Sequence, residues 1–194
     1  MKEVTMDLTS LITGAITGGA ADKIGKATGA DQDTVQTVIQ AGLPVILGQL
    51  ANNTSTPEGT QQLDTAVSKD HSGGTLLDSL GSLFGGGDSN PDGNKILGHV
   101  FGDNQSAATS TIAKTTGVDS ATVVKILSFL APLVMAYLGK QKSTDNLDAG
   151  GLSTVLQQQK SPSGGALSQI ATAVLDKNSD GNIVDDILGG FFKR

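Results

Sequence analysis

The chain contains no cysteine and no tryptophan, and aromatic residues make up only 3% of it. Without cysteine it can form no disulfide, thiolate metal site or iron–sulfur cluster, and it has no cysteine nucleophile. With so few aromatic side chains, a platform on which bases or sugars would stack has almost no material. Charged residues are also scarce, at 16% against the ~25% typical of soluble domains. Thr, Ser, Asn, Gln and Gly must therefore supply much of the surface.

Signals for export or membrane insertion are also missing. Glu3 and Asp7 stand where a secretory signal needs a basic start and an apolar run. The longest uncharged apolar stretch, residues 126–138, has 13 residues and contains Pro132, whereas a membrane span takes about 20. We therefore expect this stretch to be a buried core helix, with no membrane span, in a cytoplasmic protein.

The second half of the chain repeats the first. A shift of 88 residues places residues 24–56 on 112–144 without a gap, and residues 88–94 on 176–182. Eleven positions of the longer match are identical, among them Gly29/Gly117, Asp31/Asp119 and Pro44/Pro132. Such self-similarity indicates one structural unit used twice. We predict a single compact all-α unit over residues 1–194, composed of repeat one (6–93), repeat two (94–181) and a truncated third copy of the first helix (182–194).

The apolar pattern within each repeat is helical. Apolar residues recur at steps of three and four, and almost no stretch sustains the alternation of a strand. Pro44 and Pro132 interrupt equivalent apolar segments and are expected to kink or split their helices. We predict that these two segments pack against each other at the centre of the core, around a pseudo-two-fold axis. Small residues on them would allow close approach: Ala41, Gly42, Gly48, Ala131 and Ala136. Loops rich in Gly, Asn, Ser and Asp are predicted at 51–60, 70–75, 85–94, 140–151 and 160–165.

Residues 112–126 fit a helix-turn-helix template, and copy one repeats it. Gly29 and Gly117 are predicted to end one helix in a left-handed conformation, and Asp31 and Asp119 to cap the next. The small residue at the predicted helix crossing is Ala113 or Gly25, and the inward-facing positions are Val118, Val123, Ile126, Ala30, Val35 and Val38.

DNA binding through the second helix of this motif is the alternative function. Affinity for nucleic acid depends on clustered Lys and Arg, and guanine is read mostly by Arg. The net charge is −6, and the one arginine is Arg194. Acidic residues at the start of the second helix, such as Asp119, would repel phosphates. We interpret the motif as a structural corner and expect no nucleic-acid partner.

An Asp- and Asn-rich segment near the C-terminus matches the first eight positions of an EF-hand loop, with Gly181 at position six and Ile183 at eight. The candidate metal ligands are Asp176, Asn178, Asp180, Asn182 through its carbonyl, and Asp186. Position twelve departs from the pattern, since Ile187 replaces the bidentate Glu. The hypothesis is a weak Ca2+ site, and Ca2+ is the only cofactor the sequence suggests. The alternative is an Asx-rich turn that caps a helix and needs no metal.

Catalytic candidates are few. The two histidines are His71, expected in a solvated polar loop, and His99, expected on a helix surface or partly buried. The sequence contains no nucleophile elbow, phosphate-binding loop or zinc-binding His-Glu-x-x-His helix. We therefore expect no enzyme, no catalytic residue and no cofactor-binding residue. Tyr137 is expected to anchor the end of its helix with one hydrogen bond.

Three segments together, residues 90–102, 130–135 and 175–187, resemble the YidB-like bacterial proteins (domain of unknown function nine-three-seven). The likeness covers most of the chain. It implies a multihelical bacterial protein without an established activity. The Asp-rich loop of the family maps onto Asp176, Asn178, Asp180, Asp185 and Asp186, with Asn178 at a position where many relatives would show Asp.

Together these features predict a non-enzymatic module for protein interaction or self-assembly. The Gly- and Ala-rich helix faces and the Phe191-Phe192 tail suggest contact with another protein or with a second copy. The tail has an alternative role, which we favour: it packs into the fold as the truncated third copy.

Overall fold

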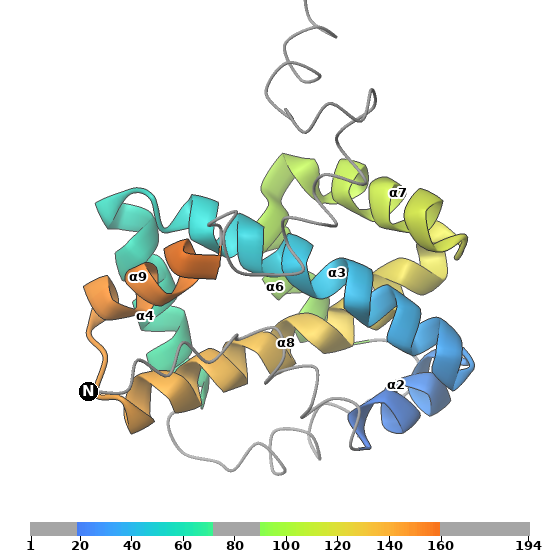
Figure 1. Cartoon of the computed structure of the whole chain (residues 1–194), viewed down its shortest axis with the longest axis horizontal. Coiled ribbons are helices and arrows are strands. Elements are labelled where there is room, and N and C mark those ends of the chain that lie inside the picture. The colour runs from blue at the N-terminus through green and yellow to red at the C-terminus, as the bar shows by residue number, and fades with distance from the viewer. Residues whose placement is uncertain (1–18, 72–89, 160–194) are drawn as a thin grey trace, which may run out of the picture.

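A computed structural model describes residues 19–71 and 90–159, and this part of the chain is helical, without strands (Figure 1). The all-α prediction is confirmed for it. The helices are α2 (Ala20–Thr28), α3 (Gln32–Asn53), α4 (Pro57–His71), α6 (Pro91–Phe101), α7 (Gln105–Thr116), α8 (Ser120–Thr144) and α9 (Ala149–Gln159), with a short 3-10 turn, η1 (Gly102–Asn104), between α6 and α7.

The two long helices, α3 and α8, pack against each other at the centre. Both run from the end where α2 and α7 lie to the end where α4 and α9 lie (Figure 1). They also carry most of the buried apolar side chains, including Leu43, Leu47, Phe129 and Leu130. Each central helix contacts α2 and α7 at one end of the pair. At the other end α9 packs on α3 and α4 packs on α8, and α6 packs mainly on α8.

Each central helix continues through its proline. Pro44 lies inside α3 and Pro132 inside α8, and neither helix is divided. Proline has no backbone N–H, so the carbonyl four residues earlier loses its usual helical donor. The carbonyls affected are those of Gln40 in α3 and Ser128 in α8. These two oxygens are therefore open to contacts from outside their own helices.

Gly42 of α3 packs directly against the Leu127 side chain of α8. A Cβ added to Gly42 would lie 2.6 Å from Cδ2 of Leu127 on α8. Only a residue without a side chain lets α3 come this near. The prediction that small residues permit close approach is confirmed at Gly42. It is wrong for Gly48, where an added Cβ would meet nothing within 4 Å.

The connections are shorter than the composition predicted. Residues 51–53 still belong to α3, residues 91–94 form the first turn of α6, and residues 140–144 the last turn of α8. Asn, Asp, Ser and Gly favour loops, but the same residues also favour the ends of helices, where their side chains satisfy free backbone groups. Composition alone could not separate these two uses.

Two helices, α3 and α8, are long and apolar enough to cross a membrane by length and composition. In this fold, 56% of the apolar window in α3 and 72% of that in α8 are buried inside the protein. Central helices of soluble proteins have the same character. The expectation of no membrane span stays a prediction.

Candidate functional site

Two short turns, which we call corners, join α2 to α3 and α7 to α8 at one end of the central pair. Gly29 and Gly117 adopt left-handed conformations, with φ of 74° and 73°. Asp31 Oδ1 accepts from the Thr34 N–H at 2.8 Å, and Asp119 Oδ1 accepts from the Thr122 N–H at 2.9 Å. The hydrogen bonds from these threonines hold the pKa of each aspartate below its ordinary value. The predicted glycine ends and aspartate caps are confirmed.

The second helix of the corner offers little surface to a ligand. Ser120, Ala121 and Lys125 are exposed at the start of α8, but the helix is buried without interruption from residue 126 to 136. A helix that reads a DNA groove needs exposed side chains along its N-terminal part and basic residues around it. Here the exposed Asp119 precedes Lys125 on the same corner. This geometry fits a structural corner better than a reading helix.

A second feature is the contact between the start of α6 and the proline-freed carbonyl of α8. Asn90 caps α6, since its Oδ1 accepts from the Gly93 N–H at 2.9 Å. A Cβ added to Gly93 would lie 1.7 Å from the Ser128 carbonyl oxygen. The backbone of α6 therefore rests directly on the oxygen that Pro132 leaves without its helical donor. Asn90 Nδ2 is buried there without a hydrogen-bond partner.

The corresponding position on α3 is differently covered. Ser128 is 1% exposed beneath α6, whereas Gln40, which occupies the same register before Pro44, is exposed. Thr37, one turn earlier on α3, is exposed as well. The two central helices thus carry the same proline-freed carbonyl, one beneath a packed helix and one at the exposed residue Gln40, which precedes the buried Ala41 and Pro44.

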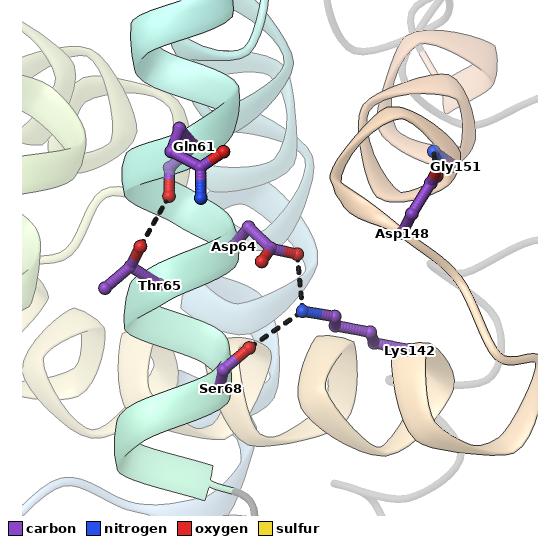
Figure 2. Close-up of polar contacts among 7 residues, drawn as sticks. All are labelled: Gln61, Asp64, Thr65, Ser68, Lys142, Asp148 and Gly151. Carbon is purple, nitrogen blue, oxygen red and sulfur yellow. Dashed lines mark hydrogen bonds and ion pairs between the residues drawn. The ribbon is translucent and has the colours of Figure 1, made fainter.

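Figure 2 shows a polar cluster between α4 and α8. Lys142 Nζ lies 2.5 Å from Asp64 Oδ1 and donates to Ser68 Oγ at 2.7 Å. The side chains of Lys142 and Asp64 are only 22% and 19% exposed. The Lys142–Asp64 contact is an ion pair by distance, without the angle of a hydrogen bond to Oδ1. It ties the end of α8 to α4.

Side chains of α9 donate to carbonyls at the C-terminal end of α3, and a side chain from the last turn of α3 donates to α6. Gln157 Nε2 donates to the Ala51 carbonyl at 2.5 Å, and Ser153 Oγ donates to the Thr54 carbonyl at 3.0 Å. Asn53 Nδ2 in turn donates to the Val100 carbonyl of α6 at 2.8 Å. The end of α3 is therefore held by residues about 50 to 100 positions away, and no local sequence signal could reveal them.

The predicted Ca2+ ligands, Asp176, Asn178, Asp180, Asn182 and Asp186, lie outside the described residues. Within residues 19–71 and 90–159, no three His, Asp or Glu residues gather closely enough to hold a metal ion. His99 is exposed in the last turn of α6. His71 ends α4 rather than standing in a loop, because the helix continues through residues 69–71.

Tyr137 is half-buried against the core. Burial, together with the Asp145 carboxylate, raises the pKa of its hydroxyl.

Comparison with family models places the chain in a known family. Residues 10–141 match the family described as bacterial protein of unknown function (DUF937). The chain belongs to this family. The YidB-like resemblance is consistent with that membership. No curated protein and no solved structure matches the chain.

Proposed function

We propose that this DUF937 protein is a non-enzymatic module for protein interaction or self-assembly, which binds a helical segment on α3 around Gln40 and Pro44. The observation that carries the proposal is the unequal cover of the two central helices. Less of the apolar window is buried in α3 than in α8, 56% against 72%. The exposed Gln40 marks where the cover is thinner.

The proposal includes a tandem repeat with a pseudo-two-fold axis. The contacts between elements support it, because they occur in matching pairs. Helix α9 packs on α3 as α4 packs on α8, and α7 packs on α3 as α2 packs on α8. The caps agree as well, with Asp31 and Asp119 each accepting from the residue three positions on. In both of these matching pairs, a helix of one half packs on the central helix of the other half.

What α3 would bind follows from what α8 binds. On α8 the cover is a helix that starts with Asn90 as its cap and presents Gly93 to a free carbonyl. A partner helix for α3 needs the same two features, an Asn cap and a Gly three residues later. A partner residue with a Cβ in place of this Gly would collide with the Gln40 carbonyl. A Cβ on Gly93 would collide with the Ser128 carbonyl in the same way.

A peptide probe tests this binding. A fluorescent peptide of residues 88–104 carries the α6 sequence, and its anisotropy reports binding to the full-length protein. We expect saturable binding that a Gly93→Val peptide does not show. If the backbone carbonyl is the contact, a Gln40→Glu variant should bind the wild-type peptide no more weakly than the wild-type protein does. Pro44→Ala restores the helical donor to this carbonyl, so that variant should bind the peptide more weakly. Equal signals from both peptides would contradict the proposal.

The Ca2+ hypothesis is a separate proposal. In copy one, the residue that matches Asn178 is Asn90, and its oxygen is used to cap α6. Asp92, which matches Asp180, pairs with Lys95 at 3.0 Å. These contacts favour the capping alternative for the C-terminal loop. Calorimetric titration of Ca2+ into chelator-treated protein distinguishes the two, since a weak site gives heat and a shift in melting at about 10 mM and a capping turn gives neither.

DNA binding stays the alternative function. The short exposed start of α8 and the acidic cap at Asp119 argue against it. Retention on immobilised DNA that falls steeply with salt concentration would support it.

A further inference from the structure

The chain carries a second copy of the sequence that covers α8. Asn90 and Gly93, which cap α6 and rest on the Ser128 carbonyl, match Asn178 and Gly181 at the shift of 88 residues. We propose that residues 178–192 bind to α3 of the same molecule, with Asn178 as a helix cap and Gly181 on the carbonyl of Gln40. The inference rests on the proposed binding site on α3, and it names what that site binds.

The linker from α9 to Asn178 is as long as the linker from α4 to Asn90. Helix α4 packs on α8 and ends at His71, and 18 residues (72–89) separate it from Asn90, the cap of α6. Helix α9 packs on α3 and ends at Gln159, and the same number of residues (18, residues 160–177) separates it from Asn178. Gln157 contacts Ala51, which is about 17 Å along α3 from Gln40. An extended chain of this length spans up to about 60 Å.

The apolar residues that follow match only after a displacement of three residues, because Asp185 and Gly189 stand in the places of Leu97 and Phe101 at the shift of 88 residues. In α6 the buried side chains after Gly93 are Leu97, Val100 and Phe101. The C-terminal segment has Leu188, Phe191 and Phe192 with the same spacing, three residues further from its glycine. Three residues are close to one helical turn of 3.6, so a helix would keep this set on the face that carries Gly181. Binding to α3 would bury the two phenylalanines.

The N-terminal segment fits the same site less well. At the shift of 88 residues, Lys2 and Thr5 stand in the places of Asn90 and Gly93. Lys2 has no oxygen with which to cap a helix. The Cβ of Thr5 would collide with the carbonyl, as a Cβ at Gly93 would lie 1.7 Å from the oxygen of Ser128. The register therefore selects residues 178–192 over residues 1–18.

Hydrogen exchange on full-length variants tests the assignment. Gly181→Ala should raise the exchange rate of α3 amides in residues 36–46 at least tenfold and leave residues 124–134 of α8 unchanged. Asn182→Ala is the control, because its match Asn94 is exposed in α6 and a substitution there removes no contact with the central helix. Unchanged exchange in α3 for Gly181→Ala would overturn the inference.

Because the chain has no cysteine, introduced pairs report proximity without background. Thr37→Cys with Asn182→Cys should be joined within one molecule by a short bismaleimide, as should the matched pair Lys125→Cys with Asn94→Cys on α8 and α6. A link in the second pair without one in the first would overturn the inference.

Two further outcomes separate this inference from the proposed function. A link between two molecules would overturn binding within the chain, while the proposed self-assembly through α3 would stand. If the α6 peptide binds neither wild type nor Gly181→Ala, the proposed function fails. If the peptide binds Gly181→Ala more tightly than wild type, both the proposed function and this inference are supported, because the wild-type tail competes with the peptide for α3. Ca2+ heat that Asn178→Ala abolishes would overturn the capping role of Asn178.

Discussion

The Cα of Gly93 sits against the carbonyl oxygen of Ser128, so closely that a Cβ there would lie 1.7 Å from it. The contact depends on a third residue, Pro132, which removes the N–H that would otherwise bind this oxygen. Proline in one helix and glycine in another thus form a single packing unit. The pair places α6 on α8 in one register.

Substitution of Gly93 should therefore destabilise the fold strongly. Gly93→Ala puts a Cβ into a backbone atom that cannot rotate away, and we expect a loss of about 3 kcal/mol, the upper end of the usual cost of overpacking. Gly98→Ala is the matched control in the same helix, where an added Cβ meets nothing within 4 Å. It should stabilise by about 0.5–1 kcal/mol. Urea denaturation measures both, and equal effects would contradict this view of the contact.

The two aspartate caps should make stability fall in acid. The pKa of Asp31 and of Asp119 is lowered in the fold from 3.8. A lowered folded pKa means that the contribution is present above the unfolded pKa and is lost as pH falls through the folded one. Replacing both residues by Asn keeps an oxygen cap without a titratable group. The melting temperature of that variant should fall less than that of wild type below about pH 4. If the melting temperatures of the variant and of wild type fall in parallel with pH, the two aspartate caps do not titrate as described.

The ion pair between Lys142 and Asp64 should contribute more than an exposed pair. Its side chains are 22% and 19% exposed, against 73% and 82% for Lys95 and Asp92. A double-mutant cycle with Ala at both positions should give a coupling energy of about 1 kcal/mol for the first pair and ~0.3 kcal/mol for the second. Added salt should reduce the second more than the first. Couplings of the same size would indicate that burial does not matter here.

Loss of the Gln157 side chain should loosen the end of α3. Its Nε2 donates to the carbonyl of the buried Ala51, which also accepts from Thr54 Oγ1 at 3.2 Å. The substitution therefore removes one of two hydrogen bonds to this oxygen, and a hydrogen bond of this kind contributes about 0.5–1.5 kcal/mol. We expect Gln157→Ala to lower the free energy of unfolding by that amount and to speed amide exchange in the last turn of α3. Gln158→Ala, at an exposed neighbouring position, is the control. A similar loss in both variants would assign the effect to α9 as a whole.

Local signals in the sequence predicted the helices and their ends well. Gly117 ends α7 in a left-handed conformation and Asp119 caps α8, as their residue types require. The loop prediction around Asn90 was wrong because an N-cap and a loop use the same amino acids. Contacts such as Lys142 with Asp64 or Gln157 with Ala51 could not be predicted. They join residues far apart in sequence whose types occur throughout the chain, and only the packing of α8 and α9 brings them together.

The hydrogen bond from Gln157 to Ala51 links residues 106 positions apart, and this spacing matters during synthesis. A ribosome releases a chain from its N-terminus at about 5–20 residues per second. Helix α3 is therefore complete for at least several seconds before its last carbonyls meet α9. During that interval the carbonyls of Ala51 and Thr54 lack the donors that Gln157 and Ser153 supply in the finished fold.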